Sequence, residues 1–84
     1  MNWLFKFLEI NNDFVRVIYI VDGLPTDDFD GEFIYYFNTK KVNVIKKAKN
    51  DPFGKKAGYI AAHIRKYADL ERKQHKDYYR IVFG

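Results

Sequence analysis

Residues 51–70 read DPFGKKAGYIAAHIRKYADL, and the spacing of their apolar side chains predicts an amphipathic helix. At about 100° per residue, one stripe collects Phe53, Ala57, Ile60, Ala61, Ile64, Tyr67 and Ala68. The opposite stripe collects Lys55, Gly58, Ala62, Arg65, Lys66, Asp69 and Lys73. Asn50 or Asp51 can cap the first amides, and Pro52 suits the first helical position. Gly54 and Gly58 weaken helix propensity, so we expect an irregular first turn that packing must hold.

Apolar, β-branched and aromatic runs on both sides of this helix predict strands. These runs cover residues 3–10, 14–21, 32–37, 42–47 and 78–83. Turn signals at 11–13 and 38–41 join the first four runs into two hairpins. The first run also fits one face of a short helix, because periodicity alone does not settle so short a segment.

The order of these segments predicts one α+β domain covering residues 1–84. Its elements follow the order ββ-ββ-α-β, and they would form an antiparallel sheet of about five strands. One main helix would pack on one face, where its small alanines allow close approach to a flat sheet. The last strand would return to pair with an earlier one.

Composition excludes several classes of site. The chain has 19% aromatic and 48% apolar residues, which argues against disorder. It contains no cysteine and no serine, so disulfides, thiolate metal sites and the commonest nucleophiles are absent. We therefore predict no catalytic residues, no metal site and no cofactor. The first ten residues lack the pattern of a signal peptide, and no apolar window is long enough to span a membrane. A cytoplasmic protein without a membrane partner is expected.

Two features invite a metal or acid–base hypothesis. Asp28, Asp30 and Glu32 could form a weak cation site, although an ordinary solvated acidic loop explains the same pattern. His63 and His75 are the two histidines, and they lie on separate elements. We interpret His63 as a half-buried helix residue, with a functional role as the alternative.

Charge is distributed unevenly along the chain. Residues 1–37 carry two basic and seven acidic side chains, whereas residues 38–84 carry thirteen and four. The basic part predicts a nucleic-acid surface, with Tyr59, Tyr78 and Tyr79 near enough in sequence to stack on bases. Its candidate residues are Lys55, Lys56, Arg65, Lys66, Arg72 and Lys73. The alternatives are a solvated helix face or a surface that complements the acidic half.

The predicted sheet has apolar residues on both faces, but one helix covers only one of them. A large exposed apolar face is rare on a soluble monomer, so we predict a homo-oligomer, most simply a two-fold dimer. Candidate interface residues are Trp3, Phe5, Phe7, Val15, Val17 and Tyr19. The favoured function is a small non-enzymatic interaction module that self-associates through this face. Nucleic-acid binding is the alternative.

Overall fold

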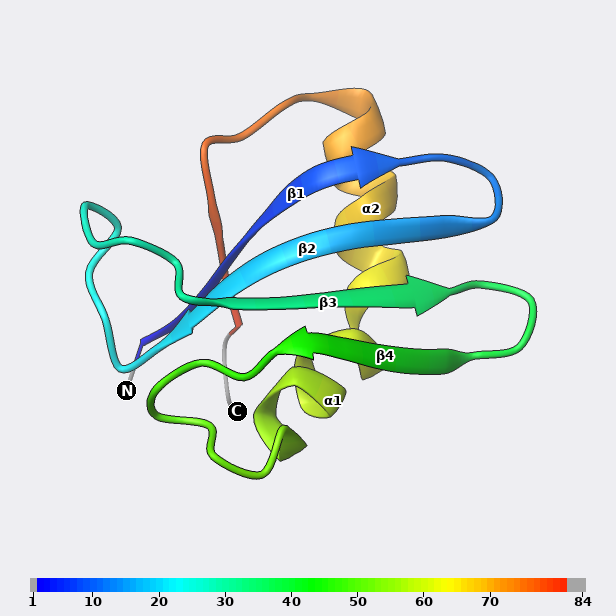
Figure 1. Ribbon diagram of the computed structural model, residues 1–84. Coiled ribbons are helices and arrows are strands. Elements are labelled where there is room, and N and C mark those ends of the chain that lie inside the picture. Colours follow the sequence, from blue (N-terminus) through cyan, green and yellow to red (C-terminus); the bar gives the residue numbers. More distant parts are fainter. Residues whose placement is uncertain (1, 82–84) are drawn as a thin grey trace.

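The computed structural model describes residues 2–81 as a five-stranded antiparallel sheet with two helices on one face (Figure 1). The elements are β1 (Trp3–Ile10), β2 (Phe14–Val21), β3 (Gly31–Tyr36), β4 (Lys41–Lys46), α1 (Lys55–Ala62), α2 (Ile64–Lys73) and β5 (Tyr79–Arg80). The α+β class and the order of strands and helical region are confirmed. The helical region differs from the prediction because it contains two helices. Neither α1 nor α2 has the length or apolar content needed to cross a membrane.

The strands are arranged in the order β4-β3-β2-β1-β5. β1 to β4 form a meander of neighbouring hairpins, and the helices then cross behind the sheet (Figure 1). β5 returns to the outer side of β1, where Tyr79 lies opposite Phe5. The predicted return of the last strand is therefore confirmed. Residues 82–83, which were predicted to continue that strand, lie outside the described residues.

The helical region begins later than predicted and is interrupted once. Gly54 has φ 71°, a left-handed conformation that glycine adopts without steric cost, and α1 starts directly after it. Pro52 therefore precedes the helix, and Phe53 is 79% exposed instead of lying on the buried stripe. His63, with φ −106° and ψ 3°, separates α1 from α2. The remaining stripe is confirmed, with Ala57, Ile60, Ala61, Ile64 and Ala68 buried and Tyr67 partly buried.

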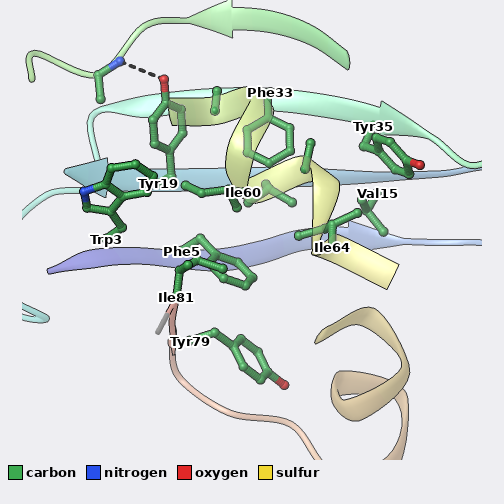
Figure 2. Close-up of a cluster of buried hydrophobic side chains, with 14 of the residues drawn as sticks. Trp3, Phe5, Val15, Tyr19, Phe33, Tyr35, Ile60, Ile64, Tyr79 and Ile81 are labelled. Atoms are coloured by element: carbon green, nitrogen blue, oxygen red, sulfur yellow. Dashed lines mark hydrogen bonds between the residues drawn. The ribbon is translucent and has the colours of Figure 1, made fainter. Parts of the chain in front are cut away.

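The core lies between the helices and one face of the sheet (Figure 2). Alternate residues of β1 and β2 point into it, and these include the six residues predicted for a subunit interface: Trp3, Phe5, Phe7, Val15, Val17 and Tyr19. All but the partly buried Phe7 are fully packed under the helices. This requires a correction, because side chains that form the core of one chain are not available to a second chain.

A buried carboxylate joins the sheet to the start of α1. Asp51 is 2% exposed and accepts hydrogen bonds from the backbone N–H groups of Lys56, at 3.1 Å, and Ala57, at 3.0 Å. The hydroxyl of Tyr19 on β2 donates to the same carboxylate at 2.8 Å. The hydroxyl also accepts a hydrogen bond from the Ala48 N–H, which Figure 2 marks with a dashed line. The predicted capping role of Asp51 is confirmed. It also fixes where α1 docks on the sheet.

The face of the sheet opposite the helices is covered in part by the chain itself. The loop after β2 folds over one end, where Lys6 Nζ lies 4.6 Å from the centre of the Phe29 ring. Gly23 in that loop lies directly against the side chain of Ile20. Leu4 and Ile20 are consequently buried on this face. The part left open carries half-buried Phe14, Ile18 and Ile34, exposed Tyr36, and an ion pair between Arg16 and Glu32.

Candidate nucleic-acid interface

Two arginines of α2 reach the tips of the two hairpins. Arg65 Nη2 donates to the carbonyl oxygen of Phe37 at 2.9 Å, in the turn after β3. Arg72 Nη2 donates to the carbonyl oxygen of Asn11 at 3.0 Å, in the turn after β1. Both guanidinium carbons lie near the Phe37 ring, at 5.4 Å and 5.7 Å from its centre. Each guanidinium is therefore positioned by one hydrogen bond and by a shared aromatic ring.

A hollow of about 290 Å³ lies between these arginines and the turns. Its lining consists of Asn12, Phe37, Asn38, Arg65, Asp69 and Arg72. Asp69 Oδ1 lies 3.6 Å from Arg72 Nη1, and Asp69 is the one acidic residue among those that line the hollow. A guanidinium has five N–H donors, so both arginines retain donors beyond their bonds to the turns. This set of donors is suited to an anion such as a phosphate group.

The structure brings together two of the six predicted nucleic-acid residues, Arg65 and Arg72. Lys56 instead donates to the Asn50 carbonyl at 2.7 Å, beside the start of α1. Lys66 lies over the Tyr67 ring at 5.8 Å. Lys55 and Lys73 are exposed on their helices. The six residues are therefore spread over the helical layer, and the predicted set is broader than the site that the arginines form.

The predicted stacking residues are also separated. Tyr59 packs edge-on against Trp3, with ring centres 5.5 Å apart. Tyr79 is buried in the core, so its ring is not available to a base. Tyr78 is exposed but lies on the connector before β5, away from the hairpin tips. The turn residues that complete the hollow were not predicted, although the Asn11–Asn12 and Asn38 turn signals could have pointed to them.

A second polar cluster fastens the connector to the end of α2. Glu71 Oε1 accepts from the Tyr79 hydroxyl at 2.6 Å and from the Lys76 N–H at 3.1 Å. Its other oxygen lies 2.6 Å from His75 Nδ1, and Asp77 lies 3.9 Å from the opposite ring nitrogen. Burial raises the pKa of Glu71, but the bonds from Tyr79, His75 and Lys76 outweigh it and hold the pKa below its usual value. The same bond to Glu71 raises the pKa of His75.

Three of the four carboxylates between residues 27 and 32 are bonded within the chain, and the fourth, Asp28, is exposed. Asp27 accepts from the Leu24 N–H, Asp30 accepts from the Lys49 N–H, and Glu32 is paired with Arg16. Among residues 2–81, no group of three or more His, Asp or Glu side chains is arranged to hold a metal ion. His63 is exposed beside Tyr59, and its functional role stays a prediction.

Comparison with known proteins leaves these contacts as the basis for a functional argument. No protein-family model, curated protein or solved structure matches this chain. The most organised cationic site among the described residues consists of the two arginines, the ring of Phe37 and the polar turns around them. The function is therefore inferred from what this arrangement can bind.

Proposed function

We propose that this protein binds nucleic acid without catalysing a reaction on it, through α2 and the hairpin tips. The observation that supports the proposal is the placement of Arg65 and Arg72 on Phe37, each bonded to a turn carbonyl beside the hollow. Phosphates attract such cations because binding releases condensed counterions. The cytoplasmic location expected from the sequence belongs to this proposal, since nucleic acid is available there.

Fixed arginines bind phosphate better than free ones. A free arginine side chain loses about 2 kcal/mol of rotamer entropy when it is fully ordered. Here the contacts with Phe37 and the turn carbonyls order both side chains during folding, so less entropy remains to be lost on binding. The planar guanidinium also matches two phosphate oxygens at once. A purely structural role would use the same contacts to hold α2 against the hairpins, and binding measurements distinguish the two roles.

Replacing Arg65 and Arg72 with glutamine should weaken binding and reduce its dependence on salt. Each phosphate contact to a single strand contributes about 0.7 to the slope of log K against log salt, so the slope should fall by about 1.4. Fluorescence anisotropy of a labelled oligonucleotide, titrated at several salt concentrations, measures this slope. The matched control is Lys47→Gln with Lys49→Gln, two exposed lysines in the segment after β4.

The control variant should keep the slope of the natural protein. Thermal unfolding of both double variants shows whether the fold survives the loss of the contacts to Phe37 and Asn11. The proposal is wrong if the natural protein does not bind at low salt, or if the lysine variant loses as much binding as the arginine variant.

Self-association through the open part of the sheet is the second candidate, and specific residues favour it. Phe14, Ile18 and Ile34 are half-buried there, while Ile45 and Tyr36 are exposed. This candidate predicts a mass of two chains at micromolar concentration in analytical ultracentrifugation, and a mass of one chain for Ile34→Glu. A mass of one chain for the natural protein would rule it out.

A further inference from the structure

Phe14 and Tyr36 form an aromatic row on the open face of the sheet, the face opposite the helix that carries the arginine pair. Successive residues of a strand point to opposite faces, so Phe37 packs toward the helices while its neighbour Tyr36 points away from them. Tyr36 lies opposite Phe14 on β2 and opposite Lys41 on β4. The rings of Phe14 and Tyr36 have centres 6.0 Å apart and planes inclined by 53°. Tyr36 is 38% exposed, so part of its ring is available to a ligand.

The aromatic row and the arginines belong to the same end of the molecule. The Phe37 N–H donates to the Asp13 carbonyl at 3.0 Å, which ties the two hairpin turns together. Arg72 reaches the first turn at Asn11, just before Phe14, and Arg65 reaches the second at Phe37, just after Tyr36. The two hairpin tips emerge side by side at one end of the sheet (Figure 1). A ligand that crosses these tips can therefore contact both faces.

We infer that the nucleic acid bound by this protein is single-stranded, with phosphates at Arg65 and Arg72 and a base stacked on Tyr36. This inference rests on the proposed function. Bases of a single strand can leave their neighbours and stack on aromatic side chains, and each such contact strengthens binding by about tenfold or more. A duplex keeps its bases paired and stacked inside, so it can use the arginines but not Tyr36.

Charge on the open face favours this ligand over a second copy of the chain. The strand register places the cations Lys6, Arg16, Lys41 and Lys46 on this face. The register also places two carboxylates there, Glu9 opposite Arg16 and Glu32 paired with Arg16, so the strand residues of this face carry more positive than negative charge. A two-fold dimer packed on this face would bring two positively charged surfaces together, and like charges across an interface weaken association. A phosphate backbone neutralises them instead.

The test compares a labelled oligo(dT) with a DNA duplex at one salt concentration, using anisotropy. The natural protein should bind the single strand about tenfold more tightly than the duplex. Tyr36→Ala and Tyr36→Leu should each lose about tenfold in affinity for oligo(dT), while Tyr36→Phe, which keeps the ring, should stay within about twofold. Phe53→Ala is the matched control, because Phe53 is an exposed aromatic residue outside this end of the sheet.

Salt dependence separates stacking from charge. Tyr36→Ala should keep the salt slope of the natural protein, since a stacked base releases no counterion, whereas the arginine variant should not. Equal affinity for single strand and duplex, or unchanged affinity in Tyr36→Ala, would overturn the inference and leave the proposed function standing. Absence of binding to either probe would overturn both.

Discussion

Asp51→Ala should lower the free energy of unfolding by about 3 kcal/mol. The variant removes a helix cap, worth about 1 kcal/mol, and leaves the hydroxyl of Tyr19 and the N–H groups of Lys56 and Ala57 without their acceptor. Each buried donor left without a partner costs about 1–3 kcal/mol, reduced where water can reach it. For a domain of this size the loss corresponds to about 15 °C in Tm. Urea and thermal unfolding measured at neutral pH check both figures.

Two variants serve as controls for this loss. Asp51→Asn keeps one oxygen acceptor, so it should lose about half as much stability as Asp51→Ala. Asp77→Ala, on the exposed connector, should stay within about 0.5 kcal/mol of the natural protein. An Asp51→Ala protein as stable as Asp77→Ala would show that the carboxylate does not hold α1 on the sheet.

The same carboxylate should make the free energy of unfolding depend on pH in the acidic range. Burial raises the pKa of Asp51, but hydrogen bonds from the Lys56 N–H, the Tyr19 hydroxyl and the Ala57 N–H hold it below its usual value. A lowered folded pKa adds stability above the unfolded pKa of about 3.9, and this stability is lost as the pH falls through the folded value. Glu71 acts with the same sign. The difference in the free energy of unfolding between the natural protein and Asp51→Ala should therefore shrink below about pH 4. Because Glu71 is present in both proteins, this difference reports on Asp51 alone.

Strands were predictable from the sequence because their apolar runs are short and separated by strong turn signals. β1 and β2 have the predicted bounds, and β3 and β4 begin and end one residue earlier than predicted. The face that the helices cover was not predictable. Trp3, Phe5 and Tyr19 point to one side while Leu4, Ile18 and Ile20 point to the other, and both sets are apolar. Only the docking of α1 and the fold of the loop after β2 separate the two faces.

The periodicity of apolar residues did not predict where the helices begin and end. The spacing of Ala57, Ile60, Ala61 and Ile64 continues through His63, so the sequence pattern contains no sign of the break between α1 and α2. The later start has a local cause in Gly54, whose left-handed conformation a pattern of apolar residues does not reveal. Asp51 was predicted as a cap, yet its bond to Tyr19 joins residues 32 positions apart, which no local pattern reveals.

The candidate site was predictable only in its cations. Arg65 follows from the polar stripe of the helix and Arg72 from the basic residues at its end, but their partners lie 28 and 61 residues earlier in the chain. The aromatic row was missed for a similar reason. Phe14, Tyr36 and Lys41 become neighbours through strand register, and alternation alone does not decide which face stays open. Residues paired through register need the fold before they can be recognised as a site.

Gly31→Ala and Gly58→Ala should change stability in opposite directions, although both add one methyl group. A Cβ at Gly31 would lie 2.3 Å from Cε1 of the Tyr19 ring, which is buried and held through its hydroxyl. Forcing that overlap should cost about 3 kcal/mol. At Gly58, inside α1, a Cβ meets no atom within 4 Å. Alanine there should stabilise the protein by about 0.5–1 kcal/mol through its higher helix propensity. Chemical unfolding of the pair measures the contrast.

A double variant tests why Gly31 is required. The Tyr19 ring cannot change position while its hydroxyl bonds to Asp51 and Ala48, so a methyl group at position 31 overlaps with the ring. Tyr19→Phe removes these bonds and should cost about 1–2 kcal/mol by itself. In the double variant the untethered ring can shift, so the combined loss should be smaller than the sum of the two single losses. Strict additivity, or a Gly31→Ala loss below about 1 kcal/mol, would show that the ring moves freely and that the Tyr19–Asp51 bond does not make this part of the core rigid.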